Sequence, residues 1–268
     1  MARRDDYYLQ GAMWHRVMTH ESNRLARKAF QNALVEDGGF ARARGFLSYS
    51  QIIAYLHDWK EGEEDSDVTL DSALSHAREA VRLDGDDYEN IWSWAAANIY
   101  NRLFEPGMSA YRQALDMAEE RGVIDENISA LRVERADALM FQGEEDGIRE
   151  AIDIVEGEIG AGRSRSWYAW TLGWAYYELG NYTDDPQNLI RSLEYLSQFS
   201  TPSVLIQKNV VATYMALGWT KSAKAEAKKM RQKLPPGYTI DNEDKWPFQN
   251  GRTLRLGRWK GHIAEALA

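Results

Sequence analysis

Residues 167–182 read WYAWTLGWAYYELGNY, and two adjacent helical stripes can be traced along this segment. The first stripe is aromatic and recurs at three- and four-residue spacing: Trp167, Trp170, Trp174 and Tyr177. The second mixes small with large side chains: Ala169, Leu172, Gly173 and Tyr176. Such spacing is typical of an amphipathic helix, and one partner helix can cover only one of the stripes. The segment therefore predicts a helix that packs through its mixed stripe and presents its aromatic stripe elsewhere.

The same periodicity runs through most of the chain, while alternating strand-like runs are hard to find. Turn-forming residues interrupt it at short intervals, which indicates short helix hairpins. These breaks are Asp37-Gly38-Gly39, Asp84-Gly85-Asp86, Glu105-Pro106-Gly107, Gln142-Gly143, Gly160-Ala161-Gly162, Gly180-Asn181, Gly218-Trp219 and Pro235-Pro236-Gly237. The sequence thus predicts an all-α fold.

The hairpins resemble tetratricopeptide (TPR) repeats. Leu172-Gly173, Tyr176 and Gly180 stand where a TPR first helix carries its Leu-Gly pair, its aromatic residue and its turn glycine. The next unit is similar, with Tyr214, Leu217-Gly218, Ala223, Ala227 and Pro235. Earlier second helices show the same small-residue spacing at Ala26, Phe30 and Ala33, at Ala73, Ala77 and Ala80, and at Tyr111 and Ala114, and a further pair spans about 128–159. The resemblance implies one structural domain, a right-handed superhelix of about six TPR hairpins over 1–237 with a capping segment over 238–268.

A narrower resemblance covers nearly the whole chain. It is carried near the start by Asp6-Tyr7-Tyr8-Leu9-Gln10-Gly11, Ala33-Leu34 and Gly39-Phe40-Ala41-Arg42-Ala43, with an insertion before Ala73. Near the end it is carried by Leu217-Gly218, Lys233-Leu234-Pro235 and Trp246-Pro247-Phe248. These motifs look like the C-terminal TPR regions of bacterial class III adenylate cyclases and related winged-helix transcriptional activators. Neither the catalytic nor the DNA-binding domain of those proteins is present, so the resemblance implies a regulatory module or a stand-alone relative, without cyclase chemistry.

Composition excludes several function classes. Of 268 residues, 44% are apolar, enough to bury a core, and the net charge of -9 disfavours a nucleic-acid-binding role. Cysteine is absent, which excludes disulfides, thiolate metal sites and a cysteine nucleophile. No signal peptide or membrane-spanning run is apparent, so we expect a cytoplasmic protein that contacts no membrane.

Three candidate chemical sites are weak. The histidines are scattered and form no metal-binding pair: His15, His20, His57, His76 and His262. Residues 157–164 approach phosphate-loop spacing, but Arg163 replaces the required lysine and no strand precedes them. The acidic run Glu61, Glu63, Glu64, Asp65 and Asp67 lacks the pattern of a calcium loop. We therefore predict no catalytic residue, no metal and no cofactor.

The remaining candidate is an aromatic-rich groove. Projecting the repeat register from the aromatic stripe predicts that it is lined by Arg42, Tyr49, Ile52, Trp92, Ile99, Asp137, Met140, Trp167, Trp170, Trp174, Tyr177 and Lys208. The leading hypothesis is a non-enzymatic scaffold that binds a protein or peptide segment there. Two alternatives stay open: a regulatory module of a nucleotide cyclase or transcription regulator, and a small-ligand binder or enzyme, for which Asp137 is the obvious acid.

Charge is unevenly distributed along the chain. Residues 208–268 hold 12 Lys or Arg and 5 Asp or Glu, although the chain as a whole is acidic. Part of the excess follows one predicted helix face: Lys221, Lys224, Lys228, Lys229 and Lys233. A solvated face explains this pattern, and the alternative is a docking surface for an acidic partner or a second copy of the chain.

Overall fold

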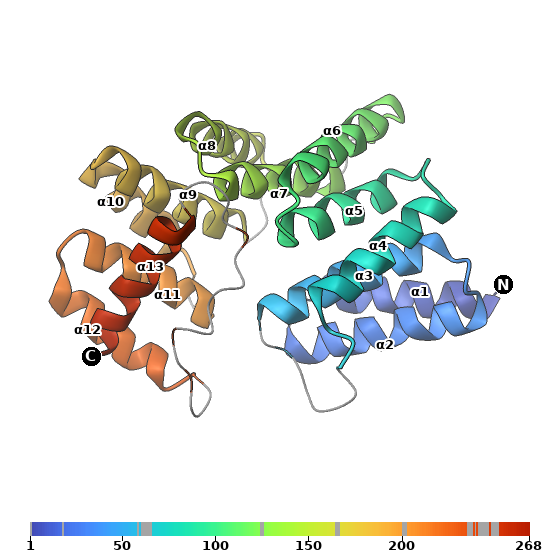
Figure 1. Ribbon diagram of the computed structural model, residues 1–268, viewed down its shortest axis with the longest axis horizontal. Coiled ribbons are helices and arrows are strands. Elements are labelled where there is room, and N and C mark those ends of the chain that lie inside the picture. Colours follow the sequence, from blue (N-terminus) through green and yellow to red (C-terminus); the bar gives the residue numbers. More distant parts are fainter. Residues whose placement is uncertain are drawn as a thin grey trace. The chain divides into compact units, whose positions relative to one another are not determined.

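The computed structural model describes residues 2–17, 19–57, 59, 66–123, 126–163, 167–199, 203–234, 238, 240, 247 and 252–268. In this part of the chain all long elements are α-helices and no strand is present (Figure 1). The helices are α1 (Ala2–His15), α2 (His20–Glu36), α3 (Ala41–Leu56), α4 (Leu70–Leu83), α5 (Tyr88–Tyr100), α6 (Phe104–Glu120), α7 (Glu126–Gln142), α8 (Glu145–Gly160), α9 (Tyr168–Thr183), α10 (Pro186–Leu196), α11 (Val204–Ala216), α12 (Thr220–Arg231) and α13 (Arg252–Leu267). The all-α prediction is confirmed.

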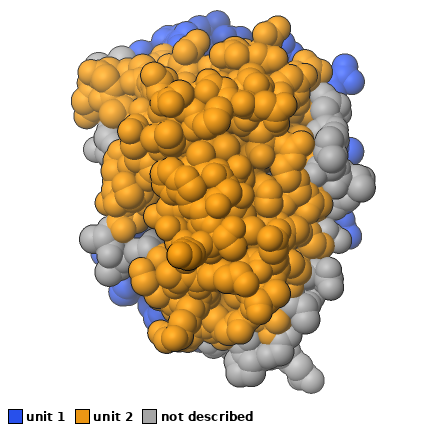
Figure 2. Space-filling model, turned by 90° about the vertical axis from the view of Figure 1, so that its left-hand side faces the viewer, with its two compact units in different colours: residues 1–131 blue, residues 132–268 orange. Residues whose placement is uncertain are grey.

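Successive helices pair as the repeat pattern predicts. Helix α1 packs with α2, α3 with α4, α5 with α6, α9 with α10 and α11 with α12. Helices α7 and α8 are joined by an ion pair between Arg135 Nη2 and Glu150 Oε1 at 2.7 Å. The helices fall into two compact units, residues 1–131 (unit 1) and 132–268 (unit 2), which Figure 2 colours separately.

Small residues let paired helices approach closely. A Cβ atom added to Gly173 in α9 would lie 2.5 Å from Leu196 Cγ in α10, closer than atoms can approach. Ser192 Oγ of α10 also donates a hydrogen bond of 2.6 Å to the Gly173 carbonyl. In α1, a Cβ at Gly11 would likewise lie 2.5 Å from the Phe30 ring of α2. The mixed stripe therefore forms the tight hairpin contact expected of it.

Two of the predicted breaks are wrong. Gly180 lies inside α9, which continues to Thr183, and Glu105-Pro106-Gly107 lies in the first turns of α6. A proline is tolerated there because the first amides of a helix have no intrahelical partner. The chain instead turns at Arg102 (φ 63°) and Asp184 (φ 52°), both left-handed without being glycine.

The core of each unit combines large side chains with facing alanines. In unit 1, Phe30 and Leu47 pack with Ala26, Ala33 and Ala43. Arg132 of α7 forms an ion pair of 3.1 Å with the buried Glu158 of α8. This pair is a second link between α7 and α8, beside the one that Arg135 forms with Glu150.

Several residues used in the sequence argument lie outside the described residues or have side chains outside them. They are Glu61, Glu63, Glu64, Asp65, Ser164, Pro235, Pro236, Gly237, Trp246 and Phe248.

Candidate binding site

In unit 1, three predicted groove residues form a partly exposed surface on α3 and α5. The Tyr49 and Trp92 rings meet edge to face with centroids 6.3 Å apart. The His15 ring of α1 also contacts the Tyr49 ring, with centroids 5.3 Å apart, and His15 Nδ1 lies 3.0 Å from Ser50 Oγ. Both aromatic residues are half-buried, so they are held in place and remain partly exposed to solvent.

Arg42 lies at the charged end of this surface. Its Nε donates a hydrogen bond to Asp87, the N-cap residue of α5, and lies 3.6 Å from Glu89 Oε2. Burial alone would lower the pKa of Arg42, but the Asp87 and Glu89 carboxylates outweigh it and raise the pKa. The Arg42 side chain keeps 47% of its surface exposed. It therefore offers a cation that is held by Asp87 and is partly exposed, two turns before Tyr49 in α3.

Ile52 and Ile99 are also in the predicted set but lie in the core of unit 1. Ile52 packs with Ala73 and Ala77 of α4, and the Ile99 side chain fills the space beside Gly107 of α6. Their side chains point toward neighbouring helices. They contribute no accessible surface to a groove.

In unit 2, most of the predicted groove residues are buried. Trp167 and Trp170 are partly exposed. Asp137, Met140, Trp174, Tyr177 and Lys208 are buried, and Trp174 has no exposed surface. The aromatic stripe of α9 is therefore covered at its centre by another part of the chain.

The covering element is α13, which packs against α11 and α12 and crosses in front of α9 (Figure 1). The Trp259 ring stacks on Trp174 at 5.9 Å and 17°, and its Nε1 donates a hydrogen bond of 2.9 Å to Asn209 Oδ1 in α11. His262 Nδ1 lies 3.1 Å from the Tyr177 hydroxyl. The sequence predicted a capping segment over 238–268, but it did not show that this segment packs on the aromatic stripe of α9.

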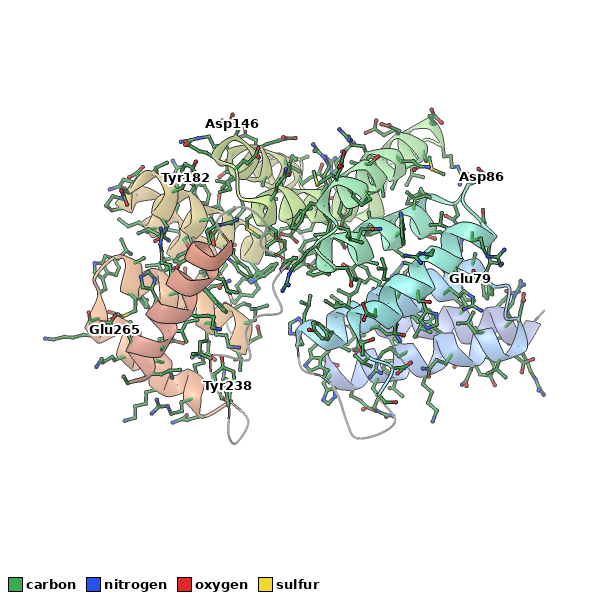
Figure 3. All side chains as sticks on the ribbon, in the orientation of Figure 1. Glu79, Asp86, Asp146, Tyr182, Tyr238 and Glu265 are labelled. Atoms are coloured by element: carbon green, nitrogen blue, oxygen red, sulfur yellow. The ribbon has the colours of Figure 1, made fainter. Side chains whose placement is uncertain are left out.

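Asp137 of α7 is a buried carboxyl group of unit 2 with a shifted pKa. Burial raises its pKa well above the usual value, the nearby Thr171 hydroxyl opposes the shift, and Glu134 adds to it. Its Oδ1 has no hydrogen-bond partner. Lys208 of α11 is buried as well, and its Nζ lies 4.8 Å from the centre of the Tyr238 ring, which Figure 3 labels.

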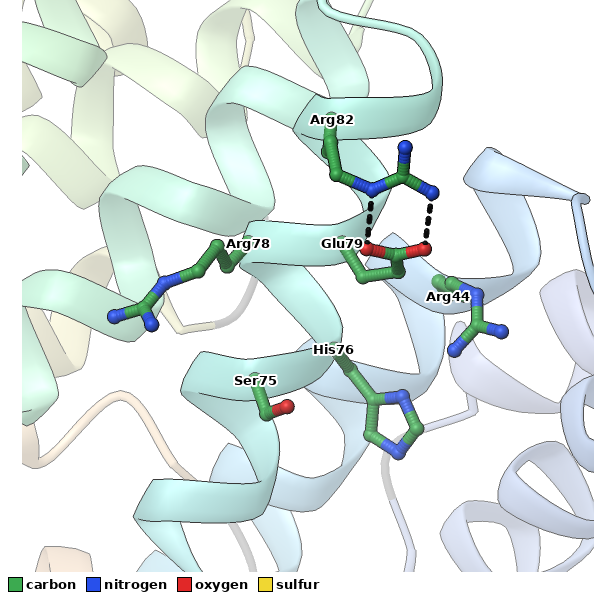
Figure 4. Close-up of a pocket in the computed structure, with 6 residues that line it drawn as sticks. All are labelled: Arg44, Ser75, His76, Arg78, Glu79 and Arg82. Carbon is green, nitrogen blue, oxygen red and sulfur yellow. Dashed lines mark hydrogen bonds and ion pairs between the residues drawn. The ribbon is translucent and has the colours of Figure 1, made fainter.

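A shallow pocket in unit 1 is lined by Arg44, Ser75, His76, Arg78, Glu79 and Arg82 (Figure 4). Its cations do not converge on one point. Arg82 forms two hydrogen bonds of 2.7 Å with Glu79, and both Nε and Nη2 of Arg44 donate to the Gly38 carbonyl. Arg78 points away from the others. The arrangement supports no specific anion site.

The other weak candidates have structural explanations where the structure describes them. Gly157 and Gly160 lie in α8, and Glu158 between them is held by Arg132 and by Arg163 at 2.6 Å. The α12 lysines are all exposed. Among the described residues, no three His, Asp or Glu side chains are grouped as metal ligands would be. No described helix is long and apolar enough to cross a membrane.

Solved structures resemble this chain although no family model and no curated protein matches it. PilF of Pseudomonas aeruginosa is similar over 91% of this chain and 96% of its own, with a TM-score of 0.51 and 12% identity. A tetratricopeptide repeat protein from Parabacteroides merdae is similar over 100% of both chains, with a TM-score of 0.51 and 10% identity. The chain has a TPR fold. Neither structure is described as a cyclase or a transcriptional activator, so the narrower resemblance stays a prediction.

Proposed function

We propose that this chain is a non-enzymatic scaffold that binds a protein or peptide segment. One observation carries the proposal: in unit 2 the faces of α9 and α11 that were predicted to line a groove hold an amphipathic helix, α13. Aromatic stacking and buried hydrogen bonds fix that helix, which is how helices are recognised in apolar grooves. These first-helix faces therefore have the chemistry needed to bind a helix.

The corresponding surface of unit 1 supplies the same kinds of groups. Tyr49 and Trp92 offer rigid aromatic area at low entropic cost, and Arg42 offers a cation whose position Asp87 fixes. We propose this surface, formed by Arg42, Tyr49 and Trp92, as the site for a partner segment that carries apolar side chains and an acceptor group.

A display library of random peptides selected on the full chain tests the proposal. Peptides that use this surface should bind Trp92→Ala at least tenfold more weakly, since buried aromatic anchors dominate interface energies. Trp219→Ala, an exposed tryptophan of unit 2, is the matched control and should bind them as the wild type does. Selection of no peptide, or of peptides indifferent to Trp92→Ala, would contradict the proposal.

The sequence alternatives stay predictions. A regulatory role in a signalling protein rests on the quoted terminal motifs, and homo-oligomer formation rests on the opposite charges of the two parts of the chain. The enzyme alternative rests on Asp137, whose pKa is raised by burial and by the nearby Glu134. The scaffold proposal needs no metal or cofactor.

A further inference from the structure

The arginines of α13 bind the carbonyl ends of two other helices. Arg255 Nη2 donates to the Met140 carbonyl at 2.9 Å and Nη1 to the Phe141 carbonyl at 3.2 Å, both in the last turn of α7. Arg258 Nη1 donates to the Asn181 carbonyl at 3.1 Å, in the last turn of α9. These carbonyls have no partner within their own helix and carry the negative end of its dipole, so they favour a cation.

A carboxylate adds to this site. Glu178 Oε2 accepts a hydrogen bond of 2.8 Å from Arg255 Nε, and both side chains are more than nine-tenths buried. Glu178 Oε1 accepts a second hydrogen bond, of 3.2 Å, from Trp174 Nε1. An ion pair so removed from water is stable only if both charges are present, so a helix seated here must bring a cation to this position.

However, α13 does not satisfy every polar group of the face it covers. Asn209 accepts from Trp259 through Oδ1, while its Nδ2 is buried with no hydrogen-bond partner. Each buried, unmatched polar atom lowers the net stability of the seated helix. A helix that satisfied the polar groups of this face better than α13 does would therefore bind it more tightly.

We propose that the face formed by the C-terminal turns of α7 and α9 with Glu178, Trp174 and Asn209 is a helix-binding site that α13 occupies in cis. A partner protein's amphipathic helix replaces α13 there. Its pattern is set by the contacts: two arginines three residues apart, the second followed directly by a tryptophan. This inference rests on the proposed scaffold function and names the partner for unit 2.

Competition in cis makes the prediction measurable. Twenty residues, 232–251, separate α12 from α13, so a tethered α13 competes at an effective concentration on the order of millimolar. Weakening α13 in cis should therefore strengthen binding of a free helix. The probe is a fluorescein-labelled peptide of residues 252–268, added to the full-length chain and followed by anisotropy.

We expect the peptide to bind the Trp259→Ala chain about tenfold or more tightly than the wild type. Adding Glu178→Gln to that chain should weaken binding at least tenfold, whereas Glu226→Gln, which alters an α12 carboxylate paired with Lys229, should not. A peptide carrying Trp259→Ala should not bind any of the chains. Arg258→Ala is the milder variant to use in place of Trp259→Ala if circular dichroism shows that the latter does not fold.

A covalent bridge that holds α13 in place provides a further control. The chain has no cysteine, so Arg231→Cys and Leu267→Cys, whose positions are joined by a hydrogen bond between Arg231 and the Leu267 carbonyl, can be bridged by a bismaleimide. Because the bridge keeps α13 on the face, the bridged chain should no longer bind the peptide.

Equal binding by the wild type and a folded Trp259→Ala chain, or none by either, would overturn the inference and make α13 a fixed cap. A wild-type dimer that dissociates on adding the peptide would also overturn it, with a second copy's α13 as the occupant. Selected peptides that depend on Trp92 would leave the scaffold proposal standing in either case.

Discussion

At the scale of single residues, the buried Asp137 makes stability depend on pH. An aspartate in the unfolded chain titrates near 3.9, and burial raises the pKa in the folded chain. The folded state then binds more protons, so stability falls as pH rises from about 4 through the folded-state pKa. We predict that Asp137→Asn is more stable than the wild type at pH 8, as measured by urea unfolding. This difference in stability should be smaller at pH 4.

Two glycines offer a matched pair. Gly173→Ala places a methyl group against Leu196, and overpacking of this kind costs about 1–3 kcal/mol. Gly157→Ala, in α8, meets nothing within 4 Å and should stabilise the chain by about 0.5–1 kcal/mol through helix propensity. Thermal unfolding of the two variants should therefore shift in opposite directions. A Gly173→Ala chain as stable as the wild type would contradict the tight packing of α9 on α10.

The left-handed turn at Asp184 gives a third test. A side chain at positive φ costs roughly 1–2 kcal/mol relative to glycine. Asp184→Gly should raise the free energy of unfolding by about 1 kcal/mol, and a decrease would show that the Asp184 side chain stabilises the turn. The same substitution at Thr183, which is helical, should destabilise the chain.

At the scale of elements, α9 shows how far a sequence pattern reaches. Every residue from Thr171 to Gly180 is buried, because α8, α10, α11 and α13 surround this part of the helix. Periodicity identified both stripes and the glycine contact with α10. It could not show what packs on the aromatic stripe. Spacing tells which face of a helix a residue lies on, but it does not identify the element that contacts that face.

This burial changes what is expected of the two central tryptophans. Trp174→Ala removes a ring stacked on Trp259 and packed edge to face on Phe141, and we predict a loss of about 3–5 kcal/mol in unfolding free energy. Trp170→Ala, at a partly exposed position, should cost clearly less. Denaturant unfolding of both variants checks the order. Equal losses would place Trp170 in the core as well.

Turns were the least predictable element. Glycines at positions 143, 162 and 218 do adopt positive φ, as a glycine signal indicates. The turns at Arg102 and Asp184 contain no glycine, so the glycine signal does not mark them. Conversely, Gly180 and Gly107 serve close helix packing inside helices, where sequence alone suggests a break.

At the scale of the whole molecule, a repeat fold predicts local responses to local damage. Hairpins contact mainly their sequence neighbours, so stability is distributed along the chain. Phe30→Ala should increase hydrogen exchange in α1, α2 and α3, which contribute the residues around Phe30, and leave α9–α13 protected. Loss of protection throughout the chain would show that it unfolds as a single cooperative unit.

The contacts of Arg255 and Arg258 make binding of α13 depend on the spacing between these two residues. Three residues along one helix set the two cations apart, and each meets the end of a different first helix, so the spacing of charges measures the step from one repeat to the next. An alanine inserted between them would rotate the second arginine by about 100° around the helix axis, away from its carbonyl. A helix with the right composition and the wrong count would then fail to bind, and recognition at this face would depend on counting residues as much as on their identity.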